Sequence, residues 1–190
     1  MLHMKSNDCT LAHYVPLRNF AVWPGNNRYF YKGILECFKS INTRTKQSKF
    51  IFIDFQMCNL LLLLDQDWLM FCIFNRIVLI TDRHLLPLAN YYKDTLSKVD
   101  SVILGTGTPE ESFKKINHVI SGEKVMPPSK IRFSSREICL LRMLTRGFTV
   151  QVLADRLQLN PKTVYALRHN ILEKMGLAKI NDIFIRASPK

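Results

Sequence analysis

Short apolar runs alternate with longer amphipathic segments along the first two thirds of the 190-residue chain. The runs are rich in phenylalanine, isoleucine and valine, as is typical of strands buried on both faces, and they lie at 20–23, 50–53, 76–80 and 101–104. The longer segments have the length of helices and lie at 30–38, 60–73, 85–96 and 109–120. This alternation predicts an α/β domain with a doubly wound parallel sheet. Ligands of such sheets bind at the carboxyl ends of the strands, where this chain has Asp54, Thr81 and Gly105.

The last third of the chain has the pattern of four short helices. Three helix starts carry a side chain that can accept a backbone N–H bond, and two helix ends are followed by glycine. These residues are Ser134, Thr149 and Asn160 at the starts and Gly147 and Gly176 at the ends. Two short helices, a tight turn and a third helix predict a helix-turn-helix, and a fourth helix is expected at 179–186.

Two adjacent prolines, Pro127 and Pro128, separate these patterns, because they exclude helix and favour extended backbone. The sequence therefore predicts four parts. They are an amino-terminal tail at 1–19, an α/β domain at 20–122, a linker at 123–130 and an all-α domain at 131–190.

Positive charge is concentrated in the all-α part. Of the formal net charge of +12, residues 129–190 contribute +8, from twelve basic and four acidic side chains. This asymmetry favours a nucleic-acid-binding module over an anionic membrane or an acidic protein as partner. The third helix would enter the major groove of double-stranded DNA. Its outer face carries Lys162, Tyr165, Ala166 and His169, flanked by Thr163 and Arg168.

Several other classes of protein do not fit the sequence. The five cysteines are scattered and form no C-x-x-C pair, which indicates neither a disulfide framework nor a zinc site and favours a reducing, cytoplasmic location. The apolar stretch at 57–74 is interrupted by Asn59 and Asp65, so no membrane span is expected. Gly105-Thr-Gly-Thr108 is too short to be a specific phosphate loop. We therefore expect no enzyme, no cofactor and no metal site.

The all-α part resembles the LuxR/NarL-type helix-turn-helix family without a gap from Phe133 to Phe184. The matching residues are Phe133-Ser-Ser-Arg-Glu137, Gly147, Ala154-Asp-Arg-Leu157, Lys162-Thr-Val164, Asn170-Ile171 and Lys174-Met-Gly-Leu177. One departure is Leu167, since the family often has histidine at that position.

The resemblance implies a role for each part of this module. Residues implied to face bases are Tyr165, Ala166 and His169, and those implied to hold the DNA backbone are Lys162, Thr163, Arg168, Lys174 and Lys179. Residues implied to pair two modules are Ile180, Ile183 and Phe184. Two alternatives stay open: Tyr165 could merely cover the turn, and the three apolar residues could close the module's own core.

The α/β part more weakly resembles a response-regulator receiver domain. Asp54 would be the phosphoacceptor, and Thr81 falls where receivers keep serine or threonine. A receiver also needs acids that hold Mg²⁺ and a lysine after the last strand, but Gly25, Asn26 and Gly105 occupy those positions. We expect a degenerate receiver in which Asp54 is vestigial or a leftover strand-end carboxylate.

The layout and Tyr29-Phe-Tyr-Lys-Gly33 also resemble enterobacterial fimbrial regulators of this family. The leading hypothesis is thus a sequence-specific transcriptional regulator of fimbrial or surface-structure genes. It would act without normal phosphorylation, as a homodimer or as a heterodimer with another LuxR-type response regulator. The alternatives are an adaptor that modifies a partner's DNA binding and a regulator that senses a small molecule.

Overall fold

The amino-terminal half of the molecule is built around one sheet. The computed structural model describes residues 13–15, 20–40, 49–66, 68–70 and 76–187. The strands are β1 (His13–Val15), β2 (Phe20–Trp23), β3 (Phe50–Phe55), β4 (Arg76–Thr81) and β5 (Val99–Leu104), and they lie side by side in that order. β2 to β5 are parallel, whereas β1 pairs antiparallel with β2 at the edge.

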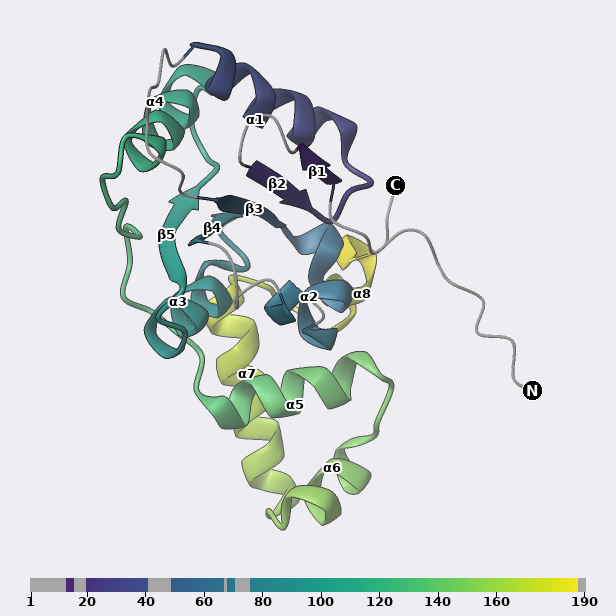
Figure 1. The fold of residues 1–190 in the computed structure, drawn as a ribbon. Helices are drawn as coiled ribbons and strands as arrows, with labels where there is room; N and C mark the ends of the chain where they lie inside the picture. The colour runs from purple at the N-terminus through teal and green to yellow at the C-terminus, as the bar shows by residue number, and fades with distance from the viewer. Residues whose placement is uncertain (1–12, 16–19, 41–48, 67, 71–75, 188–190) are drawn as a thin grey trace, which may run out of the picture.

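Helices cover both faces of this sheet (Figure 1). Those of the α/β domain are α1 (Arg28–Ser40), the short 3₁₀ helix η3 (Met57–Asn59), α2 (Leu60–Asp65), α3 (Leu86–Thr95) and α4 (Pro109–Ile120). Alternate strand residues point to opposite faces. Phe52 and Val78 face α1 and α4, whereas Ile53 and Leu79 face α2 and α3. The predicted doubly wound α/β domain is confirmed.

Four helices follow: α5 (Ser135–Thr145), α6 (Val150–Leu157), α7 (Pro161–Met175) and α8 (Asn181–Ala187). The predicted capping box is present, since Ser134 Oγ accepts from Glu137 N and a Glu137 carboxylate oxygen accepts from Ser134 N. Gly176 ends α7 in the left-handed conformation, as glycine does without a Cβ penalty. The all-α prediction is confirmed.

Some predicted boundaries differ from the structure. The helix expected at 60–73 ends at Asp65, where Gln66 turns left-handed with φ 67°. Residues 67 and 71–73 of that expectation lie outside the described part of the chain. The expected tail at 1–19 contains β1, because the backbone of 13–15 pairs with the free edge of β2. None of the described helices is long and apolar enough to cross a membrane.

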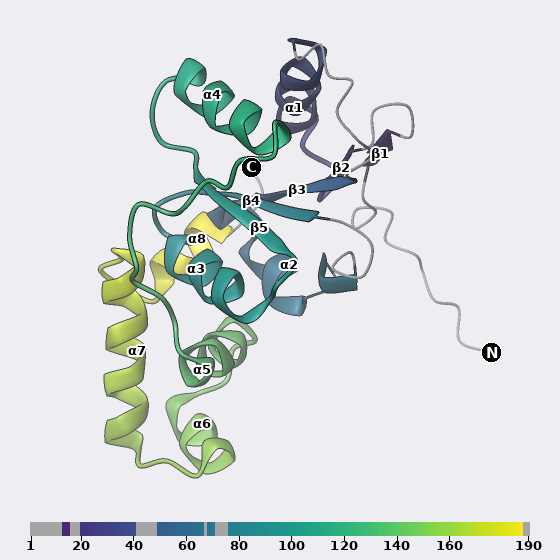
Figure 2. The ribbon, with the colours of Figure 1, turned by 60° about the vertical axis from the view of Figure 1, so that its left-hand side comes forward.

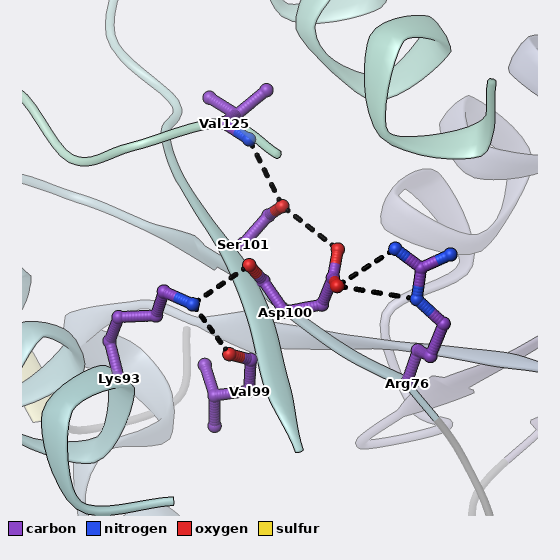
Figure 3. Close-up of polar contacts among 6 residues, drawn as sticks. All are labelled: Arg76, Lys93, Val99, Asp100, Ser101 and Val125. Carbon is purple, nitrogen blue, oxygen red and sulfur yellow. Dashed lines mark hydrogen bonds and ion pairs between the residues drawn. The ribbon is translucent and has the colours of Figure 1, made fainter. Parts of the chain in front are cut away.

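The segment expected as an extended linker contacts the α/β domain along its length. Val125 N donates to Ser101 Oγ (3.1 Å) and Val125 O accepts from Val102 N (3.3 Å), so the segment lies along β5 (Figure 3). Asp100 beside it accepts from Arg76 at 2.8 Å. Further along, Asn90 Nδ2 on α3 donates to the carbonyl oxygens of Ser129 and Ile131, each at 2.7 Å.

One apolar core continues from the sheet into the helix-turn-helix. It contains Leu63 of α2 and Leu88 of α3 together with Leu141 of α5 and Ile171 of α7. Figures 1 and 2 show α5 and α7 below the α2 and α3 side of the sheet. The prolines therefore separate two sequence patterns without separating two cores.

Candidate nucleic-acid interface

The leading end of α7 lies at the far end of the molecule from the sheet (Figures 1 and 2). Asn160 caps it, because its Oδ1 accepts from Lys162 N at 2.8 Å, and Pro161 occupies the first turn. No acidic residue lies in that first turn. The positive end of the helix dipole therefore adds to the lysine charge, which favours an approaching phosphate.

The outer face of α7 is open to solvent as predicted. Tyr165 is 57% exposed, and the other exposed residues of the first three turns are Lys162, Thr163, Ala166, His169 and Asn170. Arg168 is half-buried. The structure thus brings together the side chains expected to face bases with most of those expected to hold backbone.

The inner face of α7 is anchored in the core. Val164 and Ile171 have no exposed surface and Met175 has 1%. These side chains pack with those of α5 and α6, which fixes which face of the helix points outward. Fully burying each such side chain stabilises the fold by about 1.5–3 kcal/mol.

Lys174 is placed differently from the role implied by the family pattern. Its Nζ donates to both carboxylate oxygens of Glu137, each at 2.8 Å, and its side chain is only 30% exposed. Burial acts to raise the pKa of Glu137, but the bonds from Lys174 and Ser134 outweigh burial and lower that pKa. Lys174 therefore joins α7 to α5, whereas Lys179 remains exposed.

The residues expected to pair two modules are divided by the structure. Ile183 has no exposed surface and belongs to the chain's own core. Ile180 is half-buried, and Phe184 is 39% exposed. α8 also contacts η3 of the α/β domain. The alternative in which these residues close the module's own core applies to Ile183.

Asp54 lies at the carboxyl end of β3 with no exposed surface. Its Oδ2 accepts from Asn27 Nδ2 at 2.7 Å and its backbone carbonyl accepts from Asn59 Nδ2 at 2.9 Å, whereas Oδ1 is buried with no hydrogen-bond partner among the described residues. Burial raises the pKa of Asp54, and the bond from Asn27 opposes this rise only in part. Because this carboxyl group has no exposed surface, it is poorly placed to act as a nucleophile.

The surroundings of Asp54 include residues that the sequence interpretation missed. Asn27, and not Gly25 or Asn26, reaches Asp54, because Asn27 caps α1 by accepting from Phe30 N at 3.0 Å. Asp82 accepts from Met57 N (2.7 Å) and Leu85 N (2.9 Å), so its carboxylate holds two loops together. The sequence could have indicated both residues, because Asn27 directly precedes a helix and Asp82 directly follows a strand.

The two other receiver positions are occupied by local contacts. Thr81 Oγ1 donates to Asp82 O at 3.1 Å, and Gly105 N donates to Thr81 O at 2.8 Å. Among the described residues no three His, Cys, Asp or Glu side chains lie where they could hold a metal ion. Together with Ile185 and Arg186 of α8, Asp54 and Asp82 line a cleft of about 840 Å³.

Comparison with known proteins gives the following matches. Residues 132–187 match the family described as bacterial regulatory proteins, luxR family, and residues 3–120 match the EcpR N-terminal domain. YqeH of Escherichia coli (strain K12) is 28% identical over 170 residues, which are 88% of this chain and 80% of YqeH. The Vi polysaccharide biosynthesis protein TviA of Salmonella typhi is 23% identical over 158 residues, 82% of this chain and 88% of TviA.

Among solved structures, the chain is similar to an RcsB chain in a structure of two RcsB dimers bound to two parallel DNAs. That similarity has a TM-score of 0.46 and 18% identity, and it covers 83% of this chain and 92% of the RcsB chain.

Proposed function

Because the chain belongs to the family with an EcpR N-terminal domain and carries a luxR-family DNA-binding domain, we propose that this transcriptional regulator reads a specific DNA sequence through α7. The observation that carries the proposal is the outer face of α7. Lys162, Tyr165 and His169 are exposed on it, while Val164 and Ile171 fix the helix in the core. Readout of the major groove requires a helix that is fixed in position and has exposed hydrogen-bond donors at its leading end.

We assign two roles to the residues expected to contact DNA. Tyr165, Ala166 and His169 face base edges, because they lie on the outermost strip of the leading turns. Lys162, Thr163, Arg168 and Lys179 hold phosphates. Lys174 is left out of this set, since its ammonium group is bonded to Glu137.

Two copies, or one copy and another LuxR-type response regulator, would read half-sites about one helical turn apart, roughly 34 Å. The exposed part of α8, with Phe184 39% and Ile185 72% exposed, would contact the second module while Ile183 stays in the core. Such dimers double the number of phosphate contacts, so affinity falls steeply with salt.

Regulation would not use normal receiver phosphorylation. The unexposed Asp54 carboxylate is hydrogen-bonded to Asn27, and Gly105 supplies no ammonium group for an incoming phosphoryl group. Control would instead come from the amount of the protein or from a partner. The proposal includes no catalytic step and no cofactor.

The proposed targets are genes for surface structures such as fimbriae. The protein would bind them in the cytoplasm, where the chromosome is accessible. The name of TviA links one relative to the biosynthesis of a polysaccharide. That link and the fimbrial-regulator resemblance support the same broad class of target.

The test is a selection of duplexes from a randomised DNA library by the purified full chain, followed by gel-shift titration across salt concentrations. Enrichment of one motif, lost in His169→Ala but retained in His118→Ala on α4, supports the proposal. Salt-sensitive binding without an enriched motif would contradict autonomous base reading. It would favour the adaptor that acts on a partner's DNA binding.

A further inference from the structure

A histidine of the α/β domain holds the carboxyl end of the recognition helix α7. His84 lies between β4 and α3, and its Nδ1 is 2.7 Å from the carbonyl oxygen of Met175, the last residue of α7. Nε2 of the same ring is 3.3 Å from a guanidinium nitrogen of Arg186 on α8. One imidazole ring therefore contacts both terminal helices.

The two contacts fix the tautomer of His84. A guanidinium group can only donate, so Nε2 accepts from Arg186 and the ring proton lies on Nδ1, which donates to Met175 O. The last carbonyls of a helix have no partner within the helix. Gly176 N donates to the carbonyl oxygen of Glu173, and Leu177 N donates to that of Leu172. His84 donates to the carbonyl oxygen of Met175.

This bond and the pair between Lys174 and Glu137 differ in kind from the apolar packing that holds the rest of α7. The buried face of the helix is held by apolar packing, which is non-directional, whereas a hydrogen bond at the helix end is directional. The fifteen residues of α7 span about 22 Å, so a tilt of about 5° at its carboxyl end moves the leading end by about 2 Å. Hydrogen bonds to base edges do not survive a displacement of that size.

We propose that His84 is a positioning residue for DNA recognition, which sets the angle of α7 through Met175 O. The inference rests on the proposed function, because it concerns the helix that reads DNA. His84 follows Asp82 by two positions and lines the same cleft as Asp54. The loop at the end of β4 is thus the connection between the strand-end cleft and the DNA-reading surface.

The experiment compares full-chain variants on a labelled duplex selected by the wild-type protein, with dissociation constants measured by fluorescence anisotropy. His84→Asn keeps a donor at the position of Nδ1, whereas His84→Gln places its amide at the position of Nε2. We expect roughly three- to tenfold weaker binding for His84→Ala and His84→Gln, and nearly wild-type binding for His84→Asn. His118→Ala is the matched control, because His118 is an exposed histidine on the opposite face of the sheet.

Hydrogen–deuterium exchange at 172–178 gives a second readout, which is independent of DNA. We expect faster exchange of these amides in His84→Ala and His84→Gln, but not in His84→Asn, alongside the loss of affinity. Equal affinities of all variants overturn the inference and leave the proposed function intact. Wild-type affinity in His84→Gln together with weakened binding in His84→Asn has the same meaning. A wild-type chain that selects no duplex overturns the proposed function, and the DNA part of the inference with it.

Discussion

The ammonium group of Lys174 and the carboxylate of Glu137 are joined by two hydrogen bonds of 2.8 Å between α7 and α5. The Glu137 side chain is 4% exposed, so the pair is shielded from water and salt on the carboxylate side. Glu137 also closes the capping box with Ser134. One acid therefore fixes both the start of α5 and the position of the recognition helix.

Lys174 and Lys162 have separable roles, although both are lysines of α7. Lys174→Met leaves a buried carboxylate without its charged donor, so the free energy of unfolding falls by about 2 kcal/mol. Lys162→Met changes stability by less than about 0.5 kcal/mol but weakens DNA binding. Urea denaturation and salt titration of both variants separate these effects. A reduced salt slope in Lys174→Met would instead assign that residue to the DNA backbone.

Acid should weaken the fold through Glu137. The pKa of Glu137 is lowered in the folded chain, so its stabilising effect is complete above the unfolded value of about 4.3 and is lost as pH falls through the folded value. Urea midpoints between pH 3 and pH 7 measure this loss. Glu137→Gln, which cannot titrate, has a flatter profile over the acid range if this assignment is correct.

Asp54 should have the opposite pH dependence. Because burial raises its pKa, the carboxyl group stabilises the fold at low pH and this effect is lost as pH rises through the folded value. Asp54→Asn is therefore expected to raise the melting temperature at pH 8, with a smaller difference at pH 4. Asp82→Asn is the control, since its carboxylate accepts from two backbone N–H groups. A lower melting temperature for Asp54→Asn at pH 8 would refute this view.

His169 and Lys162 are expected to affect DNA binding in different ways. His169→Ala should reduce the preference for the selected motif by about 1–3 kcal/mol, because a base contact discriminates between sequences. Lys162→Ala should weaken binding to all duplexes alike and reduce the salt slope by about 0.9. Titrations on matched and scrambled duplexes measure both. Uniform weakening by His169→Ala would remove it from the base-reading set.

Much of the fold could be predicted because local rules determine it. The apolar runs gave the strand positions, and Ser134 and Gly176 marked helix ends that the structure confirms. The end of α2 at Asp65 could not be predicted, since the apolar pattern resumes at Trp68, whose side chain folds back to donate to Leu63 O at 3.1 Å.

The part of the site that could be predicted is the part that lies on one face of a single helix. Spacing along α7 placed Lys162, Tyr165 and His169 on the outside. The capture of Lys174 by Glu137 depends on a contact between residues 37 positions apart, which no periodicity reveals. The same holds for the contact between His84 and Met175, because it joins residues 91 positions apart.

The fixed segment between the prolines and α5 has a consequence for how such regulators diversify. Asn90 holds the carbonyls of Ser129 and Ile131, and Arg132 forms an ion pair with Asp94. A helix-turn-helix grafted after the prolines would keep these contacts only if it carried Arg132 and apolar residues that fit the surface of α2 and α3. Exchange of the helix-turn-helix alone would therefore disturb the core that it shares with the sheet, whereas substitutions on the exposed face of α7 would leave that core intact.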